Sequence, residues 1–189
     1  MYKAGIQVIL DIAIRPAPIW LHHKYPSISI TDTNGDKQYP NHRYMEDIGD
    51  SMYQKYALRF TDAITEQYAN HPALLAFGID NESGDGRISY SETARQRFIA
   101  WLKNKYGTID NLDKAWAGQR WSRKINQWEE IGFPISTRNN GLPEKTLDFR
   151  RFVSDEINQL LFKVIAKVNT NAPNTLLNTN AWYFSPLKF

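Results

Sequence analysis

The segment from Ala73 to Glu82 constrains the fold of this chain more than any other. It is an uninterrupted apolar run that ends abruptly in Asp80-Asn81-Glu82, and it is bounded by Pro72 and Gly84. A short apolar run of this kind is typical of a strand in a parallel sheet that is covered on both faces. In barrel and doubly wound folds, catalytic groups lie at the carboxyl ends of such strands. The polar residues that end this run are therefore the strongest candidate site in the sequence.

Hydrophobic periodicity extends this pattern to the rest of the chain. Residues 6–14 and 175–180 predict two further strands, while residues 15–49 and 117–143 predict irregular connections. Apolar residues at helical spacing predict helices over residues 51–69, 91–106, 112–116 and about 144–168. The order strand, helix, strand, helices, strand favours parallel crossovers, and hence an α/β fold with three parallel strands.

Three parallel strands fit part of a (β/α)8 barrel or part of a doubly wound sheet. A complete barrel needs about 250 residues, so a barrel built from these 189 residues would be incomplete. The chain opens on what looks like the last turn of a helix, with Gly5 as its cap, and it stops just beyond the last predicted strand. We therefore expect both ends to be cut.

Composition excludes several classes of protein and site. Apolar residues make up 42% of the chain, which is enough for a core, and the absence of cysteine rules out disulfides and thiolate metal sites. No apolar run approaches the roughly 18 residues of a membrane-spanning helix. The 23 basic and 20 acidic residues are well mixed, so we expect neither a nucleic-acid nor a membrane partner. The first residues lack a signal-peptide layout, which favours a cytoplasmic location if the true start is present.

Candidate polar groups follow all three predicted strands: Arg15 after the first, Asn81 and Glu82 after the second, and Asn178 with Asn180 after the third. In a barrel they would line one face. Glycoside hydrolysis needs a carboxylic acid that protonates the glycosidic oxygen and a second carboxylate, and an amide beside the acid suits a sugar hydroxyl. Such an acid must carry a proton at the working pH, which partial burial would favour. The Asn-Glu pair alone is also typical of a loop or of a helix N-terminus.

Other polar and aromatic residues suggest weaker alternatives. Trp121 and Trp128 fit a sugar platform or a subunit contact, and equally fit core packing. Trp182, just beyond the last strand, is expected to face the substrate pocket. Adjacent histidines at His22-His23 point apart on a loop and have no carboxylate at helical spacing, so we expect no metal there.

Taken in order and spacing, ten segments resemble glycoside hydrolase family 42, the β-galactosidases of the large barrel clan with paired glutamates. The resemblance covers nearly the whole chain. It is carried by Val8-Ile-Leu, Pro16-Ala-Pro-Ile-Trp20, Lys24-Tyr-Pro, the Asp-Thr-Asn-Gly turn ending at Gly35, His71-Pro-Ala-Leu, Ile79-Asp-Asn-Glu82, Trp101-Leu-Lys-Asn-Lys-Tyr-Gly-Thr108, Leu112-Asp-Lys-Ala-Trp116, Trp128-Glu-Glu-Ile131 and Asp148-Phe-Arg-Arg-Phe152.

By this resemblance, Glu82 matches the family's acid/base glutamate and Asn81 matches its sugar-binding asparagine. The family's arginine after the third strand falls near Arg43, but residues 42–50 depart from the usual Arg-rich, Cys-Pro-Asn-Ser pattern, so this match is loose. Together with Arg15, Asn180 and Trp182 from the strand-end argument, these are the candidate substrate-binding residues. Some relatives bind zinc through a cysteine cluster after the acid/base, and residues 85–91 have no cysteine, so no metal or other cofactor is implied.

The resemblance also implies an architecture and an activity. Residues 1–189 would be part of a single catalytic barrel domain, holding about strands three to five with their helices and truncated at both ends. The family's nucleophile glutamate follows the seventh strand and would lie outside this chain. The parent protein would hydrolyse terminal β-D-galactosides with retention, as a homotrimer, and this chain alone would be inactive. Two alternatives stay open: a non-catalytic carbohydrate-binding half-barrel, and a related hydrolase that acts on another β-glycoside.

Overall fold

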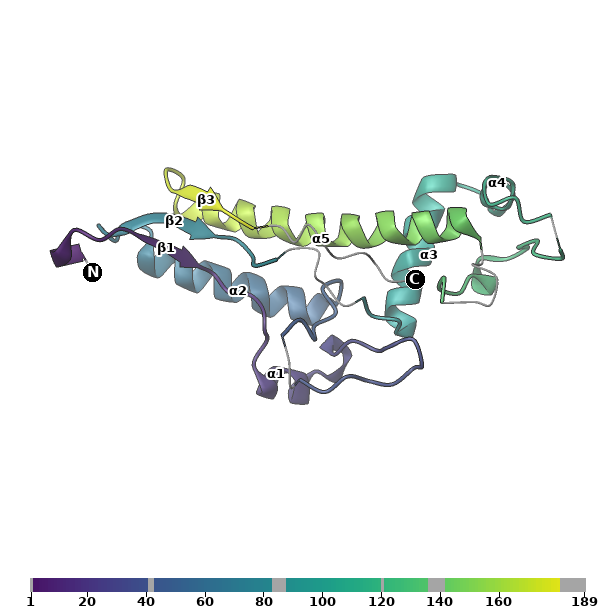
Figure 1. The fold of residues 1–189 in the computed structure, drawn as a ribbon, viewed down its shortest axis with the longest axis horizontal. Helices are drawn as coiled ribbons and strands as arrows, with labels where there is room; N and C mark the ends of the chain where they lie inside the picture. Colours follow the sequence, from purple (N-terminus) through teal and green to yellow (C-terminus); the bar gives the residue numbers. More distant parts are fainter. Residues whose placement is uncertain (1, 41–42, 83–87, 120, 136–141, 181–189) are drawn as a thin grey trace.

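A computed structural model describes residues 2–40, 43–82, 88–119, 121–135 and 142–180. The described residues form an elongated molecule (Figure 1), with the strands at one end, α3 and α4 at the other, and α5 along much of its length. The elements in chain order are η1 (Tyr2–Ala4), β1 (Val8–Asp11), α1 (Ile19–Lys24), η2 (Pro26–Ile28), α2 (Ser51–Tyr68), β2 (Leu74–Gly78), α3 (Glu92–Tyr106), α4 (Ile109–Ala115), η3 (Trp128–Glu130), α5 (Pro143–Asn171) and β3 (Leu176–Asn178).

The three strands form one parallel sheet in the order β1-β2-β3, which confirms the predicted α/β fold with three parallel strands. Each strand is shorter than predicted. The strand predicted over residues 6–14 ends at Asp11, because Ala13 adopts a left-handed φ of 50° that takes the chain out of the extended conformation. The Ile12 N–H still donates to the Gly78 carbonyl at 2.9 Å, so the segments that follow β1 and β2 separate just beyond this point.

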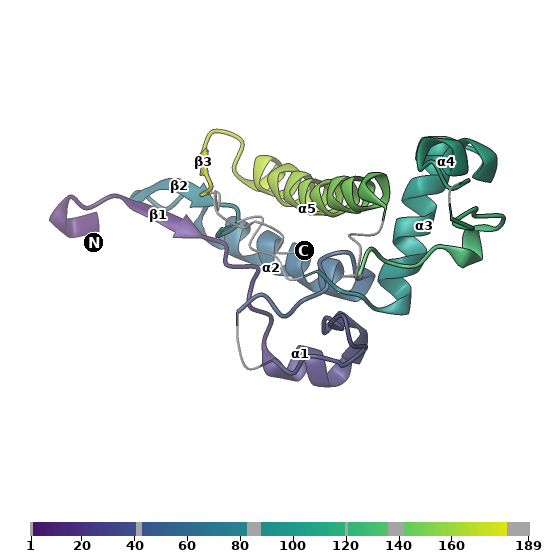
Figure 2. The ribbon, with the colours of Figure 1, turned by 45° about the vertical axis from the view of Figure 1, so that its right-hand side comes forward.

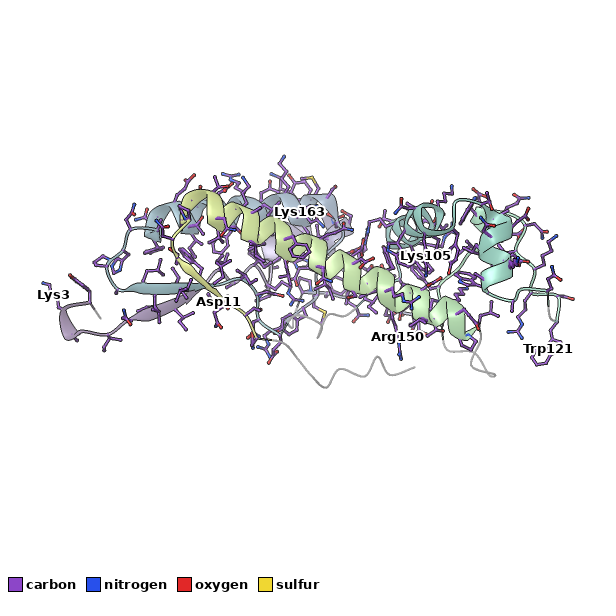
Figure 3. The ribbon with its side chains drawn as sticks, turned by 90° about the horizontal axis from the view of Figure 1, so that it is seen from above. Lys3, Asp11, Lys105, Trp121, Arg150 and Lys163 are labelled. Atoms are coloured by element: carbon purple, nitrogen blue, oxygen red, sulfur yellow. The ribbon has the colours of Figure 1, made fainter. Side chains whose placement is uncertain are left out.

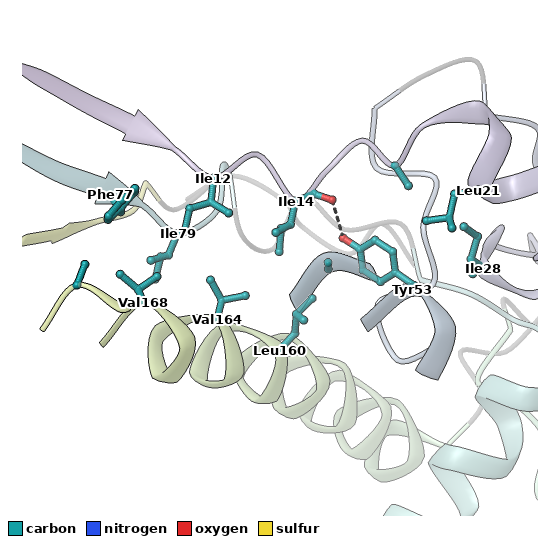
Figure 4. Close-up of a cluster of buried hydrophobic side chains, with 13 residues drawn as sticks. Ile12, Ile14, Leu21, Ile28, Tyr53, Phe77, Ile79, Leu160, Val164 and Val168 are labelled. Carbon is teal, nitrogen blue, oxygen red and sulfur yellow. Dashed lines mark hydrogen bonds between the residues drawn. The ribbon is translucent and has the colours of Figure 1, made fainter. Parts of the chain in front are cut away.

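One face of the sheet packs against α2 and α5 (Figures 1 and 2). Side chains alternate between the faces of a strand, and the row that contains Leu10 and Phe77 faces these helices. The resulting core (Figure 4) contains Ile12, Ile14, Ala17, Leu21, Ile28, Tyr53, Ala57, Phe77, Ile79, Leu160, Val164, Val168 and Ala172.

The opposite face of the sheet differs from the prediction of cover on both sides. Ile9 and Leu176 flank Ala76 in the strand register, and they are 51% and 64% exposed. Among the described residues, therefore, only the helix-facing side of the sheet is covered by a substantial core. The polar residues that follow the strands lie at the end of a sheet with one open face.

Helix boundaries follow the capping signals of the sequence. The Asp50 carboxylate caps α2 by accepting from two backbone N–H groups of its first turn, and the Ser91 hydroxyl caps α3 by accepting from the Ala94 N–H. Gly107 ends α3 with a φ of +73°, a conformation that glycine adopts without strain. Pro143 lies at the start of α5, where its missing N–H is not needed. All four predicted helices are present, although α4 begins at Ile109, three residues before its predicted start, and α5 continues to Asn171.

The segment 15–49, predicted as irregular, contains the short helices α1 and η2, so that prediction is wrong in this part. Both helices follow a proline, Pro18 before α1 and Pro26 within η2, whose fixed φ suits the start of a helix. The apolar side chains of Leu21 and Ile28 anchor them in the core. Gly35 completes the predicted turn with a φ of +91°.

A second core joins α3, α4 and the first half of α5. It contains Phe98, Ile99, Leu102, Leu112, Trp116, Ile131, Phe149 and Phe152. Within it, the buried carboxylate of Asp148 accepts hydrogen bonds from Lys105, from the Tyr106 hydroxyl at 2.6 Å and from the Trp116 ring nitrogen at 2.9 Å. Trp128 packs partly against this cluster, whereas core packing is wrong for Trp121, which is 83% exposed at the far end of the molecule (Figure 3).

Candidate active site

The chain leaves β2 through Ile79 and reaches three polar residues in succession. Asp80 is buried, Asn81 is half-buried, and the side chain of Glu82 is 19% exposed. Glu82 has a left-handed φ of 52°, which is uncommon for a residue with a side chain. Such a conformation persists where the surrounding structure holds it, and it is frequent at functional sites. The hydrogen bonds around Glu82 fix it in this conformation.

Arg15 and Asp80 form a buried ion pair that joins the segments following β1 and β2. The Arg15 guanidinium donates to both Asp80 carboxylate oxygens, at 2.8 and 3.3 Å, and also to the backbone carbonyl of Asn81 at 3.2 Å. The two side chains are only 6% and 7% exposed. This fork geometry fixes the direction of both charged groups. It also fixes the backbone from which the Asn81 and Glu82 side chains project.

Tyr44 lies at the centre of the cluster, although nothing in the sequence pattern singled it out. Its hydroxyl donates to Glu82 Oε2 at 2.8 Å and accepts from Asn81 Nδ2 at 2.7 Å. The Arg15 guanidinium lies over its ring, 4.5 Å from the centroid. Burial, and next the hydrogen bond to Glu82, raise the pKa of the Tyr44 hydroxyl above its ordinary value. The phenol is therefore protonated at neutral pH and can act as a donor.

Asn180 brings the segment after β3 into the same cluster. Its side-chain oxygen accepts from the Glu82 backbone N–H at 3.1 Å, and its side-chain nitrogen donates to Asn81 Oδ1 at 3.1 Å. Glu82 and Asn81 lie 98 and 99 positions before Asn180 in the sequence. Their approach follows from the parallel sheet, which places the ends of all its strands at one edge. Asn178, the other asparagine at this strand end, uses its backbone carbonyl to accept from Ile79 and has an exposed side chain.

The predicted catalytic residue and the predicted substrate-binding residues thus fall into three groups. Arg15, Asn81, Glu82 and Asn180 meet in one hydrogen-bonded cluster. Arg43 lies at its rim, with a guanidinium nitrogen 3.5 Å from Glu82 Oε2 and a side chain that is 58% exposed. Trp182 lies outside the described residues. Its predicted position at the pocket stays a prediction.

The adjacent histidines were expected on a loop, but both lie on the short helix α1. His22 is buried, with its Nδ1 atom 2.8 Å from the Ser29 hydroxyl and its Nε2 atom 3.5 Å from Glu46. Across the described residues there is no group of three or more His, Cys, Asp or Glu side chains placed to hold a metal ion. In the same residues, no helix is long and apolar enough to cross a membrane.

The cluster has the parts of a general acid/base site. A partly exposed carboxyl group receives one hydrogen bond from a protonated phenol and faces a cationic side chain at 3.5 Å. An amide lies beside it and is held by two partners. Such a carboxyl can give a proton to a leaving group and later take one from water, while the amide can bind a substrate hydroxyl.

A family model identifies the family of this chain. The model of glycoside hydrolase family 42, described as beta-galactosidase, matches residues 1–189. The chain is 34% identical over 178 residues to the β-galactosidase LacZ of Heyndrickxia coagulans, a match that covers 93% of this chain and 27% of that protein. The crystal structure of β-galactosidase from Bacillus circulans sp. alkalophilus gives a TM-score of 0.91 at 29% identity, covering 98% of this chain and 28% of that one.

In a second crystal structure, this chain again matches only part of a longer protein. The β-galactosidase from the psychrophilic Marinomonas ef1 gives a TM-score of 0.89 at 29% identity, over 95% of this chain and 28% of that one. The chain therefore spans 27–28% of the length of these relatives.

Proposed function

This chain belongs to glycoside hydrolase family 42, the β-galactosidases, and on that premise we propose that it supplies the general acid/base part of a retaining β-galactosidase. Glu82 is the proposed acid/base. It protonates the glycosidic oxygen of a terminal β-D-galactoside in the first step and deprotonates water in the second. Residues 1–189 are proposed to be part of one catalytic barrel domain, around its third to fifth strands.

The observation that carries this proposal is the position of the Glu82 carboxyl. It follows a strand of a parallel sheet, is 19% exposed, and is hydrogen-bonded through Oε2 to Tyr44. A carboxyl group that is partly withdrawn from water and held in one orientation suits proton transfer to a bound substrate. A solvated loop glutamate would have no such fixed partner.

Asn81 is proposed to bind the sugar 2-hydroxyl. One of its two Nδ2 hydrogens goes to Tyr44, and Oδ1 accepts from Asn180, so one N–H is left for a ligand by these contacts. A hydrogen bond to the 2-hydroxyl strengthens as the oxocarbenium-like transition state forms. Arg43, at the rim, is proposed to contact the sugar as well. The contacts of Arg15 and Asn180 point to a supporting part in the same site.

A retaining mechanism also needs a nucleophilic carboxylate about 5–5.5 Å from the acid/base. Asp80 is the carboxylate nearest to Glu82 in sequence, but Arg15 engages both of its oxygens and only 7% of its side chain is exposed. The resemblance to the family implies a nucleophile glutamate after the seventh strand of the barrel, so we propose that the nucleophile lies outside these 189 residues, which would leave this chain inactive by itself. The homotrimer and the cytoplasmic location stay predictions.

The proposal is tested in the polypeptide that contains this chain, as its source makes it. Aryl β-D-galactosides, β-D-glucosides and β-D-mannosides are supplied in parallel, and proton NMR follows the first sugar anomer that is released. We expect hydrolysis of the galactoside, with β-galactose formed first. Glu82→Gln should lower kcat/KM about 10²–10⁴-fold for leaving groups that need a proton.

Glu66→Gln is the matched control, since Glu66 is an exposed glutamate on α2. It should leave kcat/KM unchanged. Full activity of Glu82→Gln would exclude the proposed acid/base. Sugar binding without hydrolysis would favour a carbohydrate-binding protein, and a preference for glucosides or mannosides would favour a related hydrolase.

A further inference from the structure

Four hydrogen bonds around Glu82 close into a ring. The Glu82 backbone N–H donates to Asn180 Oδ1 at 3.1 Å, and Asn180 Nδ2 donates to Asn81 Oδ1 at 3.1 Å. Asn81 Nδ2 donates to the Tyr44 hydroxyl at 2.7 Å, and that hydroxyl donates to Glu82 Oε2 at 2.8 Å. The ring starts at the backbone of Glu82 and ends at its own carboxyl group.

The direction of every bond in this ring is set by one group. A backbone N–H can only donate, so Asn180 must turn its oxygen toward Glu82 and its nitrogen toward Asn81. Asn81 must then accept with Oδ1, which leaves Nδ2 to donate to Tyr44. The Tyr44 oxygen accepts there, so its single hydrogen is available for Glu82 Oε2. The opposite direction would place two donors or two acceptors against each other.

Resting on the proposed function, we propose that Tyr44 is a positioning residue that makes Oε1 the proton-carrying oxygen of Glu82. Oε2 accepts from Tyr44 and lies 3.5 Å from the Arg43 guanidinium, and both of these groups are donors. A proton on Oε2 would face them directly. The carboxyl proton therefore resides on Oε1, the oxygen for which no donor is found in this ring.

The proton balance of the two steps follows. In the first step the nucleophilic carboxylate, proposed to lie outside these residues, forms a bond to the anomeric carbon, and the bond from that carbon to the glycosidic oxygen breaks. The proton of Oε1 moves to this oxygen, so the leaving group departs as an alcohol. The negative charge left on Glu82 is stabilised at Oε2 by the Tyr44 O–H. In the second step Oε1 takes a proton from water, the water oxygen bonds to the anomeric carbon, and the bond from that carbon to the nucleophile breaks, so the starting state returns. Tyr44 keeps its own proton throughout.

Tyr44 is itself held on several sides. It is 5% exposed, has a left-handed φ of 63°, and carries Arg15 over its ring at 4.5 Å. Arg15 is in turn fixed by Asp80. A side chain so restrained can direct a proton because it has few alternative orientations.

The test is Tyr44→Phe in the polypeptide as its source makes it, assayed with two aryl β-D-galactosides. Phenyl galactoside has a poor leaving group that needs protonation, while 2,4-dinitrophenyl galactoside has a leaving group that departs without it. We expect kcat/KM for the phenyl substrate to fall about 10- to 100-fold, and that for the dinitrophenyl substrate to fall less than about threefold. Tyr56→Phe, which removes a hydroxyl that contacts Tyr25 instead, should change neither.

Asn180→Ala opens the ring at another point and should produce the same split between the two substrates, and thermal unfolding checks that both variants fold. Equal losses on the two substrates, or wild-type rates on both, would overturn the role of Tyr44. The proposed function is judged separately by Glu82→Gln, which must lose its activity on phenyl galactoside. If Glu82→Gln retains this activity, the proposed function fails and the inference about Tyr44 fails with it.

Discussion

Replacing Asp148 by asparagine tests how the second core is held together. Asparagine keeps one acceptor oxygen and replaces the other by an NH2 donor, so Lys105 and Trp116, which use different oxygens of Asp148, cannot both keep an acceptor. A fully buried N–H such as that of the Trp116 ring costs about 1–3 kcal/mol when it is left without an acceptor. The Lys105 side chain is 30% exposed, so loss of its ion pair adds only about 0–1 kcal/mol. We therefore expect Asp148→Asn to lower the local free energy of unfolding by about 1–4 kcal/mol.

Hydrogen exchange read by mass spectrometry measures this local loss even within a longer polypeptide. Amides of α4 and of the first half of α5 should exchange about 5- to 700-fold faster at neutral pH. The matched control is Asp155→Asn on the same helix, which removes an exposed carboxylate that accepts from the Trp101 ring N–H at 2.8 Å. It should cost less than about 1 kcal/mol. Equal effects of the two variants would refute the role given to buried Asp148.

The difference in stability between wild type and Asp148→Asn should depend on pH. Burial by itself raises the pKa of the Asp148 carboxyl, but the hydrogen bonds from Lys105, Tyr106 and Trp116 outweigh it and lower the pKa below its ordinary value. A carboxyl whose pKa is lowered by folding stabilises the fold above its unfolded pKa, and this contribution is lost as the pH falls through the folded one. The difference between wild type and Asp148→Asn should be full at pH 7 and shrink below about pH 4.

Two further substitutions test the contacts at and just before the start of α2. Asp50→Ala removes the carboxylate that accepts from two N–H groups at the start of α2, at 2.8 and 3.0 Å, and should cost about 1 kcal/mol. Unchanged hydrogen exchange in the first turn of α2 would contradict this. Gly49→Ala would place a methyl group onto the side chains of Arg97 and Glu156 and should cost about 1–3 kcal/mol in thermal unfolding. Gly132→Ala, where the added carbon meets nothing within 4 Å, is the control and should unfold like wild type.

Much of the local structure could be predicted from the sequence because its determinants are close together in the chain. The caps at Asp50, Ser91 and Gly107 bond within their own helices, and the strand ending before Asp80 is marked by its unbroken apolar run. The buried face of α2 was harder to predict. Thr61 is fully buried there and donates to the Ala57 carbonyl, while the larger and more apolar Phe60 is 46% exposed. Packing partners, rather than hydrophobicity, decided which face turned inward.

Some residues of the candidate site could likewise be predicted from the sequence, and others could not. The sequence by itself determined that Arg15, Asn81, Glu82 and Asn180 would gather, because parallel strands bring their carboxyl ends to one edge of a sheet. Only the tertiary structure decided that Tyr44 joins them, since it comes from a loop 38 residues before Glu82 and belongs to no strand. The position of a loop side chain depends on contacts with distant segments, here the Arg15 guanidinium and the Asn81 amide. No local periodicity records such contacts, whereas the order of strands and helices is recorded in the periodicity of the chain.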